Sequence, residues 1–417
     1  MNVVWHLRSS CAASVLSAAL LAAACKGKAA PTTRADASAA ANPEAILAPL
    51  TSTTDGDIAV GNLDAVIGGH EQRIKAQPWD PGLRAGLVEL LLTRGQFLGT
   101  IADYERASEV AEELVRDEPK RPDAWKARAS TRSTWHRFPE ALADLDAAEK
   151  AGARPETLRS ARSTILAATG KLDEAWKLAP SDGDLAGESI ALATRGLLAG
   201  ELGRLGDAEG DLKAARTRYR DVSPLPLAWM DALQAALFER NGDRAKARAY
   251  YTRANRILPL YARAASHLAA YETAQRAVTI LEPVAKRSDD PEVHAALGDA
   301  LRRTGRAAES QAELTKARER YDVLLANHRE AFADHAARFW LGAGGDPARA
   351  LPLAAENAKL RPTDEAISLW LEAAQAVPDA AAICEAARAL VALPHAAETL
   401  RGPARTAVAR CTPARDP

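Results

Sequence analysis

Residues 293–322, VHAALGDALRRTGRAAESQAELTKARERYD, contain the pattern that decides the fold. Apolar residues recur at helical spacing on both sides of Gly305, and glycine readily adopts the left-handed conformation that ends a helix. Ser310, five residues after this glycine, is small, and small side chains let two helices approach closely. The stretch therefore predicts two antiparallel helices joined by a short turn.

The same combination of a glycine and a small residue recurs along the chain. Successive glycines of this kind are 33, 39, 63 and 40 residues apart, and the interval of 63 is two periods. Self-similarity at such a period is the signature of a helical-repeat array. The glycines are Gly170, Gly203, Gly242, Gly305 and Gly345, and the small residues are Ala175, Ala208, Ala247, Ser310 and Ala350.

These offsets resemble those of the tetratricopeptide repeat. In that family a first helix carries a Leu-Gly or Leu-Ala pair, and a turn glycine, an alanine, a large residue and another alanine follow. Residues 293–322 form the clearest of four copies. The matching positions in that copy are Leu297, Gly298, Leu301, Gly305, Leu314 and Ala317. Those of the second copy are Gly242, Ala247, Tyr251, Ala254 and Pro259; those of the third are Trp125, Ala129, Ala141, Leu145 and Ala148; and those of the fourth are Gly203, Ala208, Leu212 and Ala215.

The resemblance implies an all-α, right-handed superhelical solenoid of antiparallel helix pairs. Abundant alanine, leucine, arginine and glutamate, with only 5% aromatic residues, also favour helix. We expect the array over residues 78–362, N-terminal capping helices over residues 46–77, and an atypical C-terminal helix pair and tail over residues 363–417. Terminal units of a solenoid differ from the rest because they cap its apolar stack.

The N-terminus has the pattern of an exported protein. Residues 1–24 combine a positive charge with an apolar run and predict a signal peptide. Leu20 to Cys25 resembles the lipobox of bacterial lipoproteins, which implies a lipid on Cys25; the alternative is an ordinary cleavage site. Residues 25–45 lack apolar periodicity and predict a disordered tether. We therefore expect a protein anchored in the cell envelope by lipid alone, at the outer membrane and facing the periplasm.

Two cysteines remain in the body of the protein after such processing, Cys384 and Cys411. An oxidising compartment would favour a disulfide between them. Spacing alone does not show whether their Cα atoms lie within bonding range, so two free thiols remain the alternative.

Charge and motifs argue against several functions. The chain has 54 Lys and Arg and 55 Asp and Glu, interspersed along its length, which excludes the basic footprint of a nucleic-acid-binding protein. No catalytic, cofactor-binding or metal-binding motif occurs. His328 and His335 lie seven residues apart, roughly 10 Å along a helix, which is too far for the usual metal pair. We expect both histidines on the groove or the surface.

The resemblance places the groove of the solenoid along its first helices. The groove-facing positions of the family map to Glu292, Asp299 and Arg302 in the clearest copy, and to Lys126 and Ser130 in another. Five tryptophans fall at first-helix positions that form the core in the family, namely Trp125, Trp135, Trp229, Trp340 and Trp370.

The resemblance and the N-terminus together predict a non-catalytic scaffold that binds other proteins or peptides, and its most concrete version is an accessory in the assembly of an envelope complex. One alternative is an enzyme of the α/α-toroid type that acts on envelope polysaccharide. Another is a purely structural periplasmic subunit whose groove is filled by its own C-terminal tail.

Overall fold

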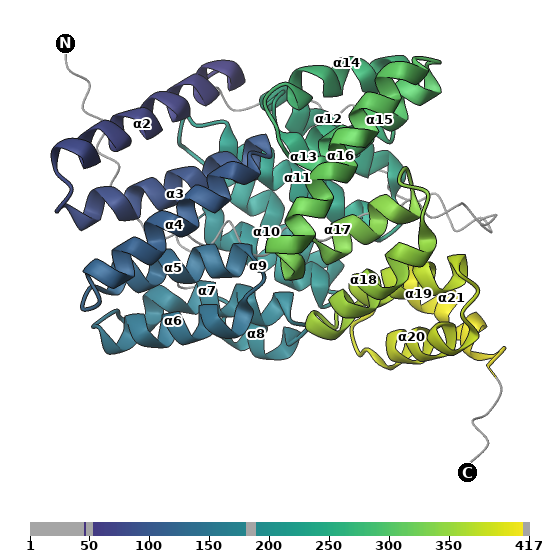
Figure 1. The fold of residues 1–417 in the computed structure, drawn as a ribbon. Helices are drawn as coiled ribbons and strands as arrows, with labels where there is room; N and C mark the ends of the chain where they lie inside the picture. Colours follow the sequence, from purple (N-terminus) through teal and green to yellow (C-terminus); the bar gives the residue numbers. More distant parts are fainter. Residues whose placement is uncertain (1–45, 47–52, 181–188, 412–417) are drawn as a thin grey trace.

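The computed structural model describes residue 46, residues 53–180 and residues 189–411 (Figure 1). Helices α2 to α21 fill these ranges, in which no strand occurs. The predicted signal peptide, Cys25 and the tether lie outside them. The helices are α2 (Gly56–Ala76), α3 (Pro81–Leu98), α4 (Ile101–Asp117), α5 (Pro122–Thr134), α6 (Phe138–Lys150), α7 (Pro155–Ala168), α8 (Leu172–Leu178), α9 (Ser189–Glu201), α10 (Leu205–Arg218), α11 (Leu225–Arg240), α12 (Arg244–Ile257), α13 (Ala262–Ala269), α14 (Ala274–Ala285), α15 (Pro291–Arg303), α16 (Ala307–Asn327), α17 (Arg329–Leu341), α18 (Pro347–Leu360), α19 (Asp364–Ala376), α20 (Ala380–Ala392) and α21 (Glu398–Val408).

The pair α15–α16 shows why these residues form a helix hairpin. The side chain of Asp290 caps α15 by accepting a hydrogen bond from the backbone N–H of Glu292. Gly305 ends the helix with φ of 82°. The hydroxyl of Ser310 then donates to the carbonyl of Gly298 at 2.7 Å, which holds the two helices in close contact. The predicted helix–turn–helix unit is confirmed.

The other turn glycines identified from the sequence behave in the same way. Each has a φ between 67° and 80°, and each small residue five positions later is fully buried against the partner helix. First helices of neighbouring pairs also contact each other, for example α15 with α17 and α17 with α19. The predicted all-α solenoid of antiparallel helix pairs is therefore confirmed.

The C-terminal region differs from the expected helix pair. Three helices occur there, and α19 packs on α17 and α18 as a further member of the array. Helix α21 then closes the end of the stack against α20 and α19. A disulfide joins Cys384 of α20 to Cys411, 27 residues away.

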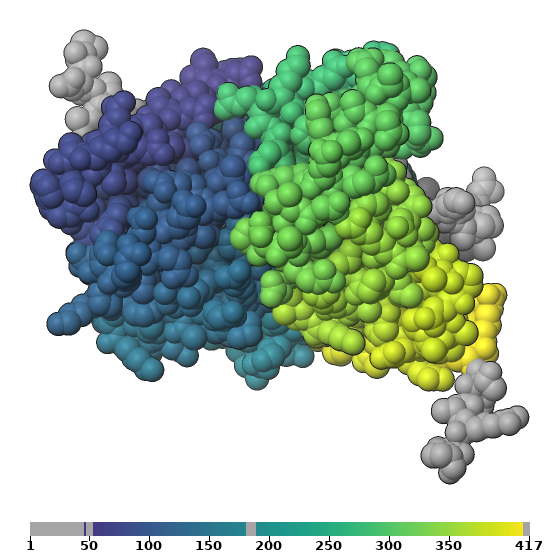
Figure 2. All heavy atoms as spheres, viewed as in Figure 1, coloured from purple at the N-terminus to yellow at the C-terminus, as the bar shows by residue number. Residues whose placement is uncertain are grey.

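The superhelix curls so tightly that it returns to its own beginning (Figure 1). Hydrogen bonds join residues 189, 193 and 194 positions apart. We call helices α2–α12 the first turn and helices α13–α21 the second turn. On the face that Figure 2 shows, the surfaces of the two turns meet along a continuous line.

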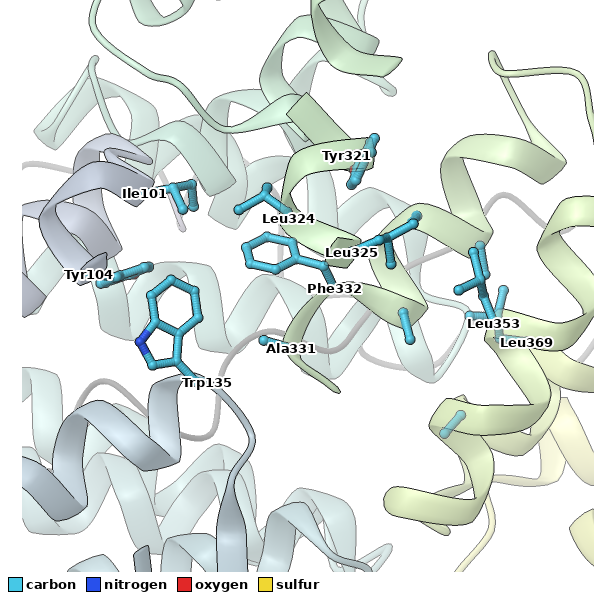
Figure 3. Close-up of a cluster of buried hydrophobic side chains, with 14 of the residues drawn as sticks. Ile101, Tyr104, Trp135, Tyr321, Leu324, Leu325, Ala331, Phe332, Leu353 and Leu369 are labelled. Atoms are coloured by element: carbon cyan, nitrogen blue, oxygen red, sulfur yellow. The ribbon is translucent and has the colours of Figure 1, made fainter. Parts of the chain in front are cut away.

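The largest apolar core lies between these two turns as well as within them. Ile101, Tyr104 and Trp135 of the first turn face Leu324 and Phe332 of the second turn (Figure 3). The rings of Tyr104 and Trp135 meet edge to face, with centroids 6.0 Å apart. Core packing thus ties together segments that are far apart in the sequence.

The predicted core role holds for four of the five tryptophans. Trp135, Trp229, Trp340 and Trp370 are buried, whereas Trp125 is half-buried and donates to the carbonyl of Pro119. Among the helices that the structure describes, none combines the length and the apolar character needed to cross a bilayer.

Candidate functional site

Three loops of the first turn contact three loops of the second turn, and we call this line of contacts the seam. The first contact joins the α3–α4 loop to the α14–α15 loop. The carbonyl of Gly99 accepts from the Ser288 hydroxyl at 2.7 Å and from the Asp289 N–H at 3.1 Å. In return, the N–H of Ile101 donates to the Asp289 carboxylate at 2.5 Å. These reciprocal bonds fix the register of the two turns.

The second contact joins the α5–α6 loop to the α16–α17 loop. The ring of His328 stacks on Trp135 with centroids 3.6 Å apart. The adjacent His136 hydrogen-bonds through Nδ1 to the carbonyl of Glu330 at 3.0 Å. Because burial disfavours the charged ring, the pKa of His136 is lowered to about 3 and that of His328 to about 4.

His136 occupies the position at which neighbouring units carry a turn glycine. Its φ is 56°, in the left-handed region that Gly99 and Gly170 also adopt in the flanking units. Histidine tolerates this region better than most residues with a Cβ. The unit therefore gains a side chain that reaches the second turn, at the expense of backbone strain.

The third contact joins the α7–α8 loop to the α18–α19 loop. Arg361 donates through Nε to the carbonyl of Ala168 at 3.3 Å. Gly170 approaches Pro362 so closely that a Cβ on the glycine would lie 2.7 Å from the proline carbonyl oxygen. The approach at Gly170 leaves no room for a larger side chain.

The seam narrows the concave side of the solenoid to a partly open pocket of about 90 Å³, which we call the lumen pocket. One wall consists of helices α7, α9 and α11 of the first turn, and the opposite wall consists of residues from α13 and the α18–α19 region. The lining residues are Ser163, Thr164, Ala167, Ala168, Thr194, Gly196, Leu197, Leu198, Gly200, Glu201, Leu212, Leu233, Ala236, Leu237, Arg240, Arg263, Arg361, Thr363 and Glu365.

An ion-pair network forms the floor of the lumen pocket. Arg240 pairs with Glu201 and with Asp364, both at 2.7 Å. Asp364 also accepts from the N–H of Ala397, and the Thr399 hydroxyl donates to the Arg240 carbonyl. The C-terminal cap therefore holds the floor in place.

A second network reaches the pocket from the seam side. Arg361 lies 3.6 Å from Asp334, and Asp334 accepts from the N–H of His335. His335 in turn pairs with Glu292 at 3.2 Å. Burial alone would lower the pKa of His335, but the charges of Asp334 and Glu292 raise it to about 9.

Three hydroxyl groups of the pocket wall are engaged with the backbone. Ser163 donates to the carbonyl of Ala175 at 2.9 Å, and Thr194 donates to that of Ile190 at 3.0 Å. Thr363 accepts from the N–H of Ala366 and caps α19. In the described part of the wall, these hydroxyls serve helix packing and capping instead of lying against a general base.

The predicted groove residues do not converge on this pocket. Glu292 lies outside the pocket lining and is linked to Arg361 through His335 and Asp334. Asp299 pairs on its own helix with the exposed Arg302 at 2.6 Å. The sequence analysis missed the pocket because its opposite wall comes from a distant part of the chain.

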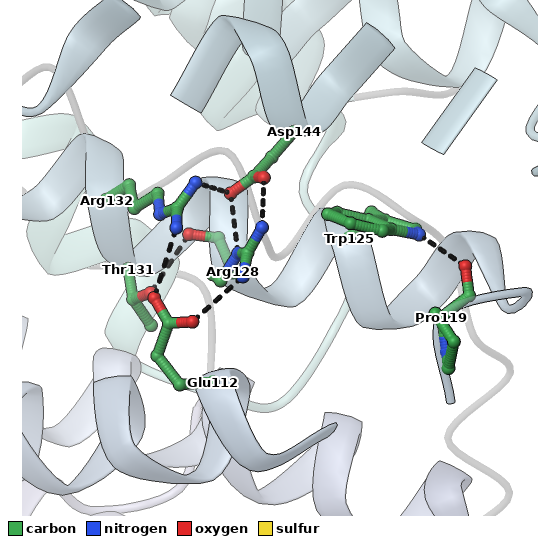
Figure 4. Close-up of polar contacts among 7 residues, drawn as sticks. All are labelled: Glu112, Pro119, Trp125, Arg128, Thr131, Arg132 and Asp144. Carbon is green, nitrogen blue, oxygen red and sulfur yellow. Dashed lines mark hydrogen bonds and ion pairs between the residues drawn. The ribbon is translucent and has the colours of Figure 1, made fainter. Parts of the chain in front are cut away.

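Lys126 and Ser130 lie on α5, outside the lumen pocket. The Lys126 ammonium pairs with Asp123, and the Ser130 hydroxyl donates to the Lys126 carbonyl. On the same helix Arg128 joins Glu112 of α4 to Asp144 of α6 (Figure 4). This part of α5 is occupied by contacts between neighbouring helices.

The expected groove or surface position of His328 and His335 is wrong. Both rings lie between packed elements and expose only 17% and 12% of their side chains. Over the ranges described, no cluster of three or more His, Cys, Asp or Glu side chains could hold a metal ion.

Comparisons with known proteins give helical-repeat structures. A chain of the crystal structure of the APC/C hetero-tetramer Cut9-Hcn1 is 13% identical over 79% of this chain, with a TM-score of 0.40, and this chain spans 62% of its length. Yeast Tom70 is 12% identical over 88% of this chain and 95% of its own, with a TM-score of 0.34. The TPR domain of P58(IPK) is 19% identical over 79% and 97% of the two chains, with a TM-score of 0.24.

No family model matches the chain, and no curated protein matches it. The class of the protein therefore rests on its own helix pairs: it is an all-α solenoid with tetratricopeptide-like offsets.

Proposed function

We propose that the protein is a non-catalytic scaffold that binds other proteins or peptides in the bacterial cell envelope. The solenoid supports the binding role, because stacked helix pairs present long rows of side chains at fixed spacing. The signal-like N-terminus and the cysteine at position 25 support the envelope location and the lipid anchor. The most concrete version is an accessory in the assembly of an envelope complex at the outer membrane, facing the periplasm.

The observation that carries the binding role is the lumen pocket. It lies on the concave side, along first helices α7, α9 and α11, and it combines apolar walls with buried guanidinium groups. Binding sites use a few placed polar groups in an apolar wall to orient a bound group, and this wall has that character.

Affinity purification from detergent-solubilised membranes tests the scaffold role. We expect the full-length protein to recover a defined partner in constant ratio, and the Cys25→Ser protein to leave the membrane fraction. Failure to enrich any partner above the level of an unrelated lipoprotein would count against a scaffold. Retention of the Cys25→Ser protein in the membrane would count against the lipid anchor but would leave the scaffold role untouched.

A purely structural subunit is the second candidate, and the closed seam favours it. The second turn occupies much of the space that an open groove would offer, and the segment around His395 covers the floor of the pocket. If this candidate is correct, variants that change the lumen pocket will leave partner recovery unchanged, whereas variants on the outer surface will reduce it.

A further inference from the structure

Two ionisable side chains in the lumen pocket interact with their neighbours through charge: Arg263 with Glu292, and Glu365 with Arg240 and Arg338. Arg263 and Glu365 are both half-buried, and neither forms a hydrogen bond or an ion pair with any other described residue. Their neighbour Arg361 exposes only 5% of its side chain, and its Nη1 atom has no hydrogen-bond acceptor within the described ranges. Leaving a buried donor unsatisfied costs free energy, so the Nη1 atom of Arg361 is the observation that points to a ligand.

The charge balance of the pocket favours an anion. Three guanidinium groups and two carboxyl groups belong to residues that line the pocket. Arg240 is neutralised by Glu201 and Asp364, and Arg361 lies 3.6 Å from Asp334, which leaves Arg263 as the guanidinium group of the pocket without an ion pair among the described residues. Burial and the nearby charge of Glu201 raise the pKa of Glu365 to about 8, so at neutral pH its carboxyl group is mainly a hydrogen-bond donor.

The size and the walls of the pocket restrict which chemical group can be attached to the anion. Its volume is about 90 Å³ and it is partly open, so it takes in a small charged group while the remainder of a ligand extends toward the opening. Leu197, Leu233 and Leu237 supply apolar surface, and Gly196 and Gly200 leave the α9 backbone open to close approach. Such a space suits a charged group on a short aliphatic stem.

We propose that the lumen pocket binds a carboxylate on a short apolar stem, with the guanidinium groups of Arg263 and Arg361 holding the charge. The apolar faces of α9 and α11 cover the stem. An acidic side chain of a partner polypeptide and a free short-chain organic acid share this chemistry. The site is independent of the scaffold role, because a free acid binds without any partner protein.

Calorimetric titration of the purified full-length protein with sodium butyrate tests the proposal, with butylamine as the cation of similar shape. Butyrate should bind and butylamine should not. Arg263→Gln should weaken butyrate binding at least about tenfold, equivalent to about 1.4 kcal/mol, because it removes a charged donor. Arg302→Gln, a change at an exposed arginine outside the pocket, should leave binding unchanged, with thermal denaturation showing that both variants fold.

Glu365→Gln keeps a neutral donor in place and should preserve butyrate binding. A blocked peptide with one central glutamate distinguishes the source: tighter binding of the peptide indicates a partner polypeptide, and tighter binding of butyrate indicates a free acid. The proposal is overturned if butylamine binds in preference to butyrate, if Arg263→Gln has no effect, or if both carboxylates bind more weakly than about 10 mM.

Discussion

Two kinds of contact hold this solenoid together, and they follow different rules. Within each turn, neighbouring helix pairs pack through small residues at fixed offsets, such as Ser310 against Gly298. Across the seam, contacts join residues about 190 positions apart through side chains that do not repeat, such as Trp135 and His328. The first kind makes a solenoid, and the second kind closes it. The shape of the concave side, and hence of any binding site there, depends on the second kind.

Truncation of the seam tryptophan should produce the largest loss. Trp135 exposes 4% of its surface and contacts both turns, so Trp135→Ala should lower the free energy of unfolding by about 3–5 kcal/mol. Trp79→Ala, at a tryptophan that is 72% exposed, should change it by less than about 0.5 kcal/mol. Urea denaturation measures both, and equal effects would show that the seam contributes little.

Loss of the C-terminal disulfide should have the next largest effect, and a local one. The bond closes a loop of 27 residues, so the double change Cys384→Ser and Cys411→Ser should destabilise the cap by about 3–4 kcal/mol. Hydrogen exchange should rise in α20 and α21 but not at the α3–α4 loop. A rise at both places would show that the cap and the seam open together.

The turn glycines provide a matched pair for testing the seam. Gly170 and Gly203 have similar φ of 76° and 74°, but a Cβ would lie 2.7 Å from the Pro362 carbonyl oxygen at Gly170 and would meet nothing within 4 Å at Gly203. Both alanine variants incur the strain of positive φ. Gly170→Ala should therefore cost about 1–3 kcal/mol more than Gly203→Ala in thermal or urea denaturation. Identical costs would contradict the close approach at this loop.

Acidification should weaken the seam by a smaller amount. The pKa values of His136 and His328 lie below the ordinary value of about 6.5, so their contribution is present above that pH and declines as the pH falls from 6.5 toward 4. Between pH 6.5 and 5.5, His328→Gln should reduce the decline in unfolding free energy by about 1 kcal/mol. An unchanged pH slope would show that His328 protonates freely in the folded protein.

The contacts within each helix pair could be predicted from the sequence, whereas the contacts across the seam could not. Turn glycines and small residues at fixed offsets reveal helix pairs, because those contacts are made within one unit. The seam leaves no period, since it depends on how far the superhelix curves. One signal was present: glycine stands at positions 99 and 170, whereas the turn between these two units carries His136.

The candidate site was missed for the same reason. Glu292 was assigned to the groove but does not line the pocket. Arg263, Arg361 and Glu365 come together only when the second turn packs on the first. Composition and spacing give no hint that these three side chains share a pocket.

Closure of the superhelix is tested most directly by a distance measurement across it. Asp64 of α2 and Arg287, which follows α14, form an ion pair at 2.8 Å although 223 residues separate them. Spin labels at Asp64→Cys and Arg287→Cys, with Cys11 and Cys25 replaced by serine, should report one short distance by electron resonance. An open solenoid, in which each helix adds about 8–10 Å, would place the labels several nanometres apart and would contradict the closed superhelix.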